Sequence, residues 1–321
     1  MHIESLYRYP IKGFSSERLL SVEVGVGEGF PLDRVYALLR TDAAFDPSAP
    51  TWLAKANFVM LMLHETIAAL QTRYTDHDKA LNIVTPDGYK KVFKLDVAAD
   101  RAALEQFVFE FLPTRLNAPP RLVTASGHQF TDKAAKFISL INLASLRALE
   151  QQWGQALDPR RFRANVYIDN AAPFAELDWV GHELRLGTIR ARVIQRNGRC
   201  AATNVNPDTG KRDRDIPGKL RAAFGHKDLG IYLWVTQAGS LREGDLVEIA
   251  HADVIHSQPT AVHASSGDQL MCTACYYLFD PRQLDSSWIR PQDLPPSWRC
   301  PDCGATRESV VPTAAHQATG S

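Results

Sequence analysis

Four cysteines near the end of the chain form two pairs, Cys272/Cys275 and Cys300/Cys303, with 24 residues between the pairs. Two residues separate the members of each pair, which lets one tight turn aim both sulfur atoms at the same ion. Two such pairs can surround a metal ion tetrahedrally. Thiolate ligands suit zinc and iron alike, so the spacing leaves both metals open. The pattern predicts one metal ion bound by four cysteines.

The residues around these cysteines resemble those of rubredoxins. Residues 272–281 resemble the first rubredoxin knuckle, and residues 294–304 resemble the second. The resemblance implies an electron-transfer site for one iron ion, with Tyr277, Phe279 and Trp298 packed around it. Burial and amide hydrogen bonds to sulfur tune the potential of such a site. A structural zinc site has no need of this aromatic set, so we expect iron and keep zinc as the alternative.

One residue of the first knuckle departs from the rubredoxin pattern. Rubredoxins usually place glycine directly after the second cysteine of a knuckle, where the backbone adopts a positive φ. Gly304 keeps this position in the second knuckle, but Tyr276 occupies it in the first. A side chain in the left-handed region costs on the order of 1 kcal/mol. We therefore expect a reshaped first knuckle.

The fifth cysteine, Cys200, stands alone in the 271 residues that precede the two pairs. An isolated cysteine often serves only as a small buried hydrophobe. The nearby run from Asn206 to Gly210, Asn-Pro-Asp-Thr-Gly, is also what a tight turn prefers. Taken alone, this loop leaves a structural role and a functional role open.

The wider sequence resembles MOSC domains, which are named for the C-terminal region of molybdenum cofactor sulfurases. The most specific match is the loop from Arg199 to Gly210. At the N-terminus, residues 9–13 (Tyr-Pro-Ile-Lys-Gly) and 33–34 (Asp-Arg) resemble the β-barrel module that precedes the MOSC domain in its amidoxime-reducing branch. Weaker matches lie at residues 142–146, 161–165, 228–232 and 239–245.

The resemblance implies a molybdenum ion held by molybdopterin, with Cys200 as the thiolate ligand from the protein. A soft, deprotonated thiolate suits such a centre. The cofactor ends in a phosphate, which needs cationic and hydroxyl partners. Lys12, Arg34 and Arg163 match family positions that bind this phosphate, and Ser145 is an added candidate donor. The other residues expected to bind the cofactor are Arg199, Cys200, Thr203 and Asn204.

Asp208 is the candidate catalytic acid–base residue beside the metal, together with Cys200. Protonation of a departing oxygen atom requires a donor near the reacting centre. A role in forming the turn stays open for Asp208. Gly13 stands where this branch of the family usually has a serine, so Ser15 or Ser16 is expected to supply the missing hydroxyl.

Strand patterns dominate the elements that must position these residues. The Pro86-Asp87-Gly88 turn predicts a hairpin between residues 81–84 and 91–95. Helical spacing predicts helices over residues 100–111, with Asp100 as N-cap, and over 142–153. Because strands and helices follow no βαβ order, we expect a β-rich α+β fold with barrel-like sheets. Further strands are expected at residues 2–9, 19–26, 34–39, 165–168, 183–186, 189–194, 230–235 and 245–249.

The cysteine map and the composition divide the chain into segments. A stretch rich in Ser, His, Pro and Ala reads as a linker. A small, polar end reads as disordered. The predicted segments are an N-terminal MOSC β-barrel module (1–125), a MOSC cofactor-binding domain (126–250), a linker (251–268), a rubredoxin-like domain (269–312) and a disordered tail (313–321).

The composition excludes several classes of protein. Lysine plus arginine equals aspartate plus glutamate at 36 each, a balance that speaks against a nucleic-acid binder. No stretch approaches the roughly 18 apolar residues that suggest a membrane span. The chain also opens without a basic segment followed by an apolar run, so no signal peptide is visible. We therefore expect a cytoplasmic protein.

Together these features predict a molybdenum-cofactor oxidoreductase. We expect it to remove oxygen from a small N-hydroxylated or N-oxide-type substrate in a two-electron reaction, with the rubredoxin domain passing electrons to molybdenum. No Rossmann or flavin signature appears, so an external flavin- or NAD(P)H-dependent reductase must supply the electrons. Two alternatives stay open: a molybdenum-cofactor or sulfur carrier with a structural zinc knuckle, and a binding module without enzymatic activity.

Overall fold

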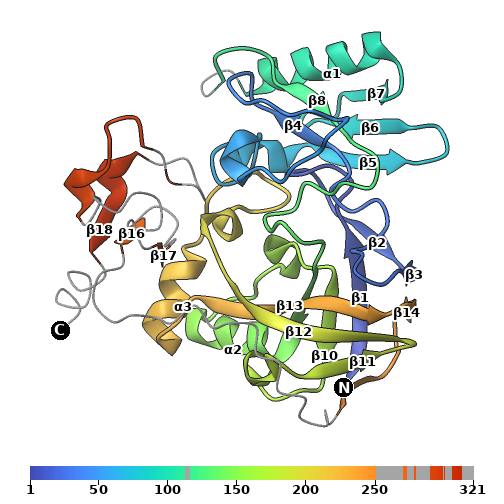
Figure 1. Ribbon diagram of the computed structural model, residues 1–321, viewed down its shortest axis with the longest axis vertical. Coiled ribbons are helices and arrows are strands. Elements are labelled where there is room, and N and C mark those ends of the chain that lie inside the picture. Colours follow the sequence, from blue (N-terminus) through green and yellow to red (C-terminus); the bar gives the residue numbers. More distant parts are fainter. Residues whose placement is uncertain are drawn as a thin grey trace. The chain divides into compact units, whose positions relative to one another are not determined.

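The computed structural model describes residues 1–112, 116–250, 270–272, 278–279, 290–298, 300 and 306–312. The chain forms two compact units. The larger unit comprises residues 1–53 and 57–252, and the smaller unit comprises residues 54–56 and 253–321. The larger unit contains a long curled sheet and a second, smaller lobe of strands (Figure 1).

An eight-stranded sheet, in the order β15-β11-β12-β13-β9-β10-β1-β2, is the main element of the larger unit. Its neighbours pair antiparallel except for β9 and β10, which are parallel. Because β1 pairs with β10, this sheet crosses the predicted domain boundary at residue 125, and that boundary stays a prediction. The strands are β1 His2–Arg8, β2 Glu17–Leu19, β9 Ile138–Asn142, β10 Val166–Asp169, β11 Glu183–Leu186, β12 Ile189–Gly198, β13 Asp228–Gln237 and β15 Val247–Ala250.

Successive side chains of this sheet point to opposite faces and pack into two different cores. On β9, Leu140 joins the core inside the curl, while Ile141 joins the core on the opposite face. On β10, Val166 and Tyr167 separate in the same way. This follows from the two-residue period of a strand. A sheet buried on both faces is a rigid base for the loops at its strand ends.

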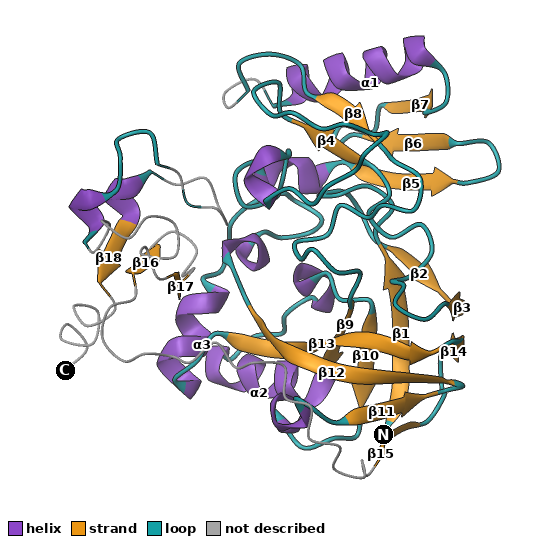
Figure 2. Ribbon diagram, viewed as in Figure 1, coloured by secondary structure: helices purple, strands orange, loops and turns teal. Residues whose placement is uncertain are grey.

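Two helices cover the outer face (Figure 2): α2 Leu143–Trp153 and α3 Ile216–Phe224. Helix α2 begins where Asn142 Oδ1 accepts a hydrogen bond from the Ala144 amide, 3.1 Å away. The helix predicted over residues 142–153 is thus confirmed. Helix α3 was not predicted, although Asp215 caps it and Pro217 lies in its first turn.

The smaller lobe of the larger unit contains a three-stranded sheet, β5-β6-β7, against which α1 packs. The predicted hairpin corresponds to β6 and β7 and is confirmed. The prediction of Asp100 as N-cap is wrong. Val97 is the N-cap, and the Asp100 carboxylate instead accepts from the Lys94 amide at 2.7 Å.

Shorter strands complete the larger unit. β4 pairs with β8, and β3 pairs with β14. The elements of the lobe and these short strands are β3 Ser21–Val24, β4 Ala37–Leu39, β5 Gln71–Thr75, β6 Ala80–Val84, β7 Lys90–Lys94, α1 Ala98–Phe111, β8 Arg121–Val123 and β14 Gly239–Arg242. The 3-10 helices are η1 Lys55–Asn57, η2 Glu65–Ala69, η3 Pro159–Phe162, η4 Ala175–Trp179, η5 Ala201–Asn204, η7 Pro291–Asp293 and η8 Arg307–Ser309.

The smaller unit contains a three-stranded sheet in the order β17-β16-β18. Cys272 and Cys300 are buried in this unit, as is the Trp298 side chain. The strands are β16 Leu270–Cys272, β17 Leu278–Phe279 and β18 Val310–Pro312.

The β-rich α+β class with a curled, half-barrel sheet is confirmed. Of the helices in the described part of the chain, none is both long and apolar enough to cross a membrane.

Candidate cofactor pocket

Cys200 lies two residues after the end of β12 and is the N-cap of the 3-10 helix η5. Its carbonyl oxygen accepts hydrogen bonds from the Thr203 amide at 3.1 Å and from Thr203 Oγ1 at 2.9 Å. Thr203 is buried, whereas Cys200 is half-buried and forms no disulfide. The threonine hydroxyl therefore fixes the backbone of the cysteine, and its assignment to a cofactor stays a prediction.

The residues after Cys200 form a hydrogen-bonded turn. Asn204 Oδ1 accepts from the Ile216 amide at 2.9 Å and so holds the start of α3. Asn206 Oδ1 accepts from the amides of Asp208 and Thr209, at 3.0 and 3.1 Å. These are the local bonds by which asparagine stabilises a turn. The loop thus has a fixed backbone.

Asp208 makes an ion pair with Arg160 of η3, with 2.8 Å between Oδ2 and Nη2. The aspartate side chain is 56% exposed, and Arg160 also binds Asp158 at 2.5 Å. Hydrogen bonds to Asp158 and then to Asp208 raise the pKa of Arg160. In this geometry Asp208 ties the loop to η3. The acid–base role assigned to it stays a prediction.

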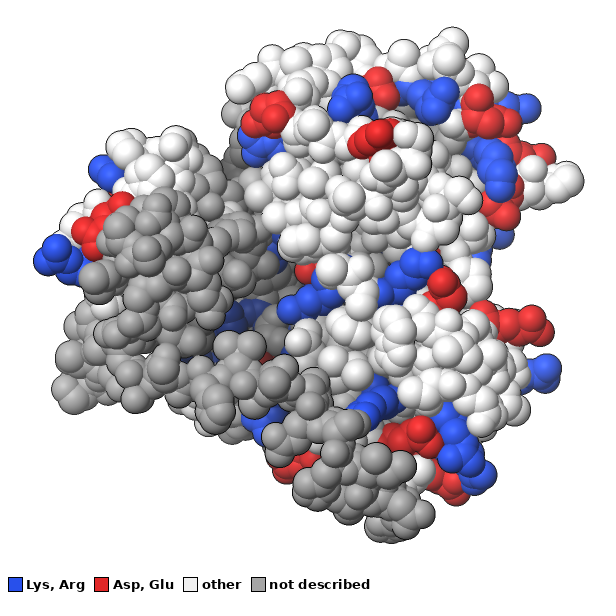
Figure 3. Space-filling model, viewed as in Figure 1, with Lys and Arg blue, Asp and Glu red and all other residues white. Residues whose placement is uncertain are grey.

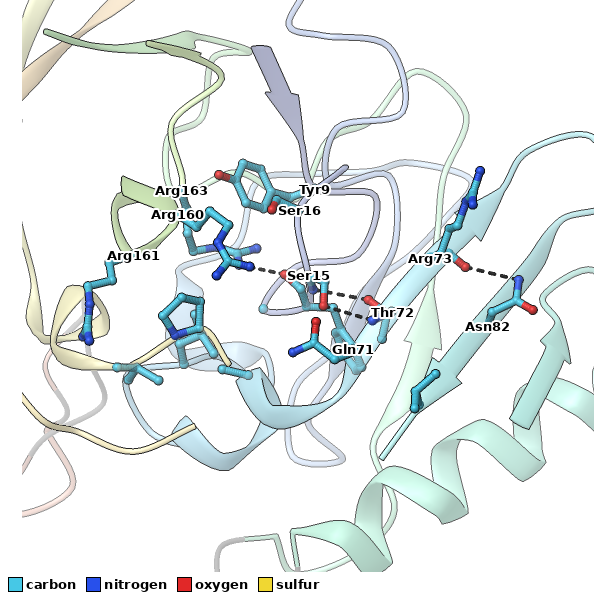
Figure 4. Close-up of a pocket in the computed structure, with 17 residues that line it drawn as sticks. Tyr9, Ser15, Ser16, Gln71, Thr72, Arg73, Asn82, Arg160, Arg161 and Arg163 are labelled. Atoms are coloured by element: carbon cyan, nitrogen blue, oxygen red, sulfur yellow. Dashed lines mark hydrogen bonds between the residues drawn. The ribbon is translucent and has the colours of Figure 1, made fainter. Parts of the chain in front are cut away.

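A cavity of about 240 Å³ lies between this loop, η3 and the strands β5 and β6. Val205 and Pro207 of the loop are among its lining residues. Figure 4 shows the residues that line it. None of its lining residues is an aspartate or a glutamate. The basic and hydroxyl side chains that line it are Arg73, Arg160, Arg161, Arg163, Ser15, Ser16, Thr72 and Tyr9.

Two of these arginines carry buried N–H groups that have no hydrogen-bond partner among the described residues. Arg163 Nη1 donates to the Phe14 carbonyl at 2.7 Å, but its Nη2 is unpaired. Arg161 binds Asp213 at 2.7 Å, and its Nε is unpaired although the side chain is only 4% exposed. An unsatisfied buried donor costs about 1–3 kcal/mol. An oxyanion bound in the cavity would offer an acceptor to such a donor and offset this cost.

The Arg163 side chain packs against the ring of Tyr9. The guanidinium carbon lies 4.2 Å from the ring centroid, and that of Arg34 lies 4.7 Å from the same centroid. Burial, and next the charge of Arg34, lower the pKa of Arg163 to about 10. Burial raises the pKa of Tyr9 to about 12, so the ring partner of both cations is a neutral phenol. A cation that burial destabilises gains from an anionic ligand.

Arg34 supports Arg163 without lining the cavity. Its Nη2 donates to the Arg163 carbonyl at 3.0 Å, and its Nη1 binds Asp33. Both arginines have positive φ, 53° for Arg34 and 52° for Arg163. Non-glycine residues in this region are strained and gather at ligand sites. The structure thus brings together two of the arginines predicted to bind the phosphate.

Lys12 lies outside the cavity. Its Nζ donates to the Phe130 carbonyl at 2.9 Å and to Asp132 Oδ1 at 2.5 Å, and Lys12 does not line the cavity. The expectation that Ser15 or Ser16 supplies a hydroxyl stays open, since both line the cavity. Ser15 Oγ is already bonded to the Leu70 carbonyl at 3.1 Å.

Ser145 and Arg199 are also directed into the protein interior. Ser145 Oγ binds both carboxylate oxygens of Glu176 at 2.8 Å and accepts from the Phe174 amide. Arg199 donates to the Leu229 carbonyl at 2.7 Å and is buried. Neither side chain lines the cavity. Their assignment to the cofactor stays a prediction.

Sequence reasoning overlooked Tyr9 as a lining residue, together with Arg160, Arg161 and Arg73. The signal for two of them was the run Arg160-Arg161-Phe-Arg163. Figure 3 shows basic side chains, with acidic ones beside them, on the surface between the smaller lobe and the eight-stranded sheet. The lining of the cavity itself contains arginines and no acidic residue, which favours an anionic ligand.

The predicted four-cysteine site is only partly described. Cys272 and Cys300 are buried, and Cys272 pairs in register with Val310 of β18. Cys275 and Cys303 lie outside the described residues. Among the described residues there is accordingly no group of three or more His, Cys, Asp or Glu side chains that could hold a metal ion.

Two family models match separate parts of the chain, one that contains Cys200 and one that contains the four C-terminal cysteines. Residues 127–248 match the family model of the MOSC domain, and residues 269–310 match that of rubredoxin.

Curated relatives match a shorter part of the chain. Mitochondrial amidoxime-reducing component 1 of Xenopus laevis is 31% identical over 122 residues, which is 34% of this chain and 35% of that protein. Mitochondrial amidoxime reducing component 2 of Bos taurus is 30% identical over 122 residues, 34% of this chain and 36% of that protein. A molybdenum cofactor sulfurase of Drosophila willistoni is 36% identical over 114 residues, 34% of this chain and 14% of that protein. The matched region thus spans about a third or less of each of these relatives.

Proposed function

Because the chain carries a MOSC domain followed by a rubredoxin domain, we propose that it is a molybdenum-cofactor oxidoreductase with a fused electron carrier. Its substrates would be small N-hydroxylated or N-oxide-type compounds. The names of the amidoxime-reducing relatives support this class of reaction. The rubredoxin domain would pass on electrons that an external flavin- or NAD(P)H-dependent reductase supplies.

The observation that carries the proposal is the pair of unpaired donors in the basic cavity. Arg161 Nε and Arg163 Nη2 are buried without a partner among the described residues. A terminal phosphate offers several acceptor oxygens and a negative charge, and charge-assisted bonds to arginine are the strong ones. The loop that contributes Val205 and Pro207 to the cavity begins at Cys200, which would be the thiolate ligand. When bound, the cofactor supplies a centre that changes by two electrons and takes up an oxygen atom.

The overall reaction fixes what the protein must deliver. Reduction of an N–OH group to N–H consumes two electrons and two protons and releases one water molecule. An iron ion bound by four cysteines changes by one electron at a time, so the carrier must be reduced twice in each turnover. The protein has to supply the protons near the departing oxygen, and Asp208 is the group proposed for that role.

A second function has support from the match to a molybdenum cofactor sulfurase. In that case the larger unit would carry or deliver cofactor or sulfur, and the four cysteines would hold a structural zinc ion. This protein would bind molybdenum but would not reduce an N-hydroxylated compound.

Metal analysis combined with an activity assay separates the proposals. Protein is purified from a host that makes the pterin cofactor, and its molybdenum, iron and zinc contents are measured. Molybdenum and iron near one per chain, together with reduction of an amidoxime or hydroxylamine by a chemical reductant, would support the reductase. Molybdenum with zinc and no such activity would indicate cofactor handling. Zinc without molybdenum would indicate a binding module.

A variant tests the ligand. Cys200→Ala should lose both molybdenum and activity while keeping the C-terminal metal. Retention of molybdenum and activity would refute the assignment of Cys200 as the metal ligand.

A further inference from the structure

The loop that follows Cys200 packs against the smaller lobe of the larger unit. The amide hydrogen bonds of this loop stay within it, but three of its residues contact the smaller lobe. Val205 is 2% exposed and belongs to the core of the lobe. Gly210 approaches the backbone of η2 so closely that an added Cβ would lie 3.0 Å from Thr66 Cα. The third residue is Arg212.

Arg212 connects the lobe to the residue next to Cys200. Its Nη2 donates to the Met62 carbonyl at 2.6 Å and binds Glu65 Oε2 at 3.0 Å. Its Nη1 donates to the carbonyl of Ala201 at 3.4 Å. Arg212 also forms a β-bridge with Val205, which closes the loop on itself. One side chain thus links the first residue of η5 to the segment 61–65.

We propose that Arg212 is a positioning residue that holds the Cys200 thiol in place by fastening its loop to residues 61–65. The backbone on one side of the thiol is fixed by Thr203, which binds the Cys200 carbonyl. Arg212 fixes the next carbonyl, that of Ala201. A metal ligand works best when its neighbours fix its orientation. The proposal rests on the proposed function only where it treats Cys200 as the cofactor ligand.

The arginine is suited to this task because its planar fork donates in several directions at once. A lysine at the same position has one ammonium group and cannot reach Ala201, Met62 and Glu65 with the same geometry. Lys211, the preceding residue, is exposed and has no side-chain contact among the described residues. It therefore offers a matched control that removes one positive charge from the same loop.

The test measures the reactivity of Cys200 in the full chain prepared without the pterin cofactor. Iodoacetamide modification is followed by mass spectrometry of the peptide that contains Cys200, so that the four C-terminal cysteines do not interfere. Arg212→Met should raise the labelling rate about fivefold, the factor that corresponds to about 1 kcal/mol for a lost hydrogen bond. Arg212→Lys should recover part of this loss, and Lys211→Met should stay within about twofold of the parent protein.

Two further measurements complete the test. Thermal unfolding shows whether the variant has lost its fold. If it has, Glu65→Gln replaces it, because this change removes the carboxylate that pairs with Arg212 and keeps the size of the side chain. In protein made with the cofactor, molybdenum content should fall in Arg212→Met and not in Lys211→Met. Equal labelling rates in the parent protein, Arg212→Met and Glu65→Gln would overturn the proposal. A raised rate in a protein that never binds molybdenum would uphold the positioning role and refute the proposed function.

Discussion

The guanidinium carbon of Arg163 lies 4.2 Å from the centroid of the Tyr9 ring, inside a cavity with no carboxylate in its lining. The ring supplies a favourable cation–π contact but no neutralising charge. Arg34 adds a second cation on the same ring, and burial lowers the pKa of Arg163 to about 10. Asp33 pairs with Arg34 and not with Arg163, so an anion bound at Arg163 would be favourable.

We therefore expect inorganic phosphate to stabilise the cofactor-free protein through Arg163. A ligand that binds only the folded state raises the unfolding temperature, by about 2–4 °C for each kcal/mol gained in a domain of this size. Arg163→Met removes the unpaired donor and should abolish most of this shift. Differential scanning calorimetry with and without phosphate measures it.

Phosphate also stabilises proteins in a general way by being excluded from their surface. Arg242→Met, which removes an exposed arginine of β14, is the control for this effect. It should keep the full shift. Equal shifts in the two variants would show that phosphate does not bind at Arg163.

Arg199 gives a prediction about stability. Its guanidinium donates to the carbonyl oxygens of Leu229 and Phe162, at 2.7 and 3.1 Å, and burial lowers its pKa. Arg199→Met should lose about 2–4 kcal/mol of unfolding free energy, because it takes the donor away from two buried carbonyl groups. Urea unfolding measures this loss. Arg192→Met, on the strand β12 that ends just before Arg199, is the control and should change little.

The same variant separates two roles of this residue. A structural arginine predicts that stability falls. A cofactor contact, as the resemblance implies, predicts near-normal stability with loss of molybdenum. The second outcome would contradict the structural role that the hydrogen bonds indicate.

Glu176 gives a prediction about pH. Its side chain is fully buried beside Ser145 and Asn142, and burial raises its pKa above 4.5. The folded state thus favours the protonated form. The contribution is present in full below pH 4.5 and is lost as the pH rises through the raised value of the folded protein. Glu176→Gln should therefore gain stability relative to the parent protein as the pH rises from 4.5 to neutral.

Urea unfolding at several pH values between 4 and 8 measures this difference. Glu23→Gln, which changes an exposed carboxylate of β3, should show no such trend. A constant difference between Glu176→Gln and the parent protein over this range would mean that the buried carboxyl group titrates normally.

The local elements around the site could be predicted because their signals lie within a few residues. The hairpin of β6 and β7 follows from Pro86-Asp87-Gly88, and α2 from apolar residues at helical spacing. The prediction of Asp100 as N-cap was wrong because its carboxylate accepts a hydrogen bond from the Lys94 amide instead of capping the helix. A cap and a cross-connection to the preceding strand look alike in a sequence.

Which side chains line the cavity was harder to predict, because this depends on hydrogen-bond partners that lie far apart in the chain. Ser145 looked like a donor for a phosphate, but its partner Glu176 lies 31 residues away and occupies it in the interior. Lys12 is likewise bound to Asp132, 120 residues away. The unpaired N–H groups of Arg161 and Arg163 have no sequence signal, since only packing decides which donors remain without a partner.

The two proposed metal sites should respond independently to loss of a ligand. Cys300 and Cys272 are buried in the smaller unit, whereas Cys200 belongs to the larger one. Metal affinity depends on each deprotonated ligand of a site and not on a distant one. Cys300→Ser should lose iron, with its visible thiolate absorption, and keep molybdenum. Cys200→Ser should lose molybdenum and keep iron. Elemental analysis of both variants measures this. Loss of both metals in Cys200→Ser would contradict independent sites, and a colourless parent protein with zinc in place of iron would assign the four cysteines a structural role.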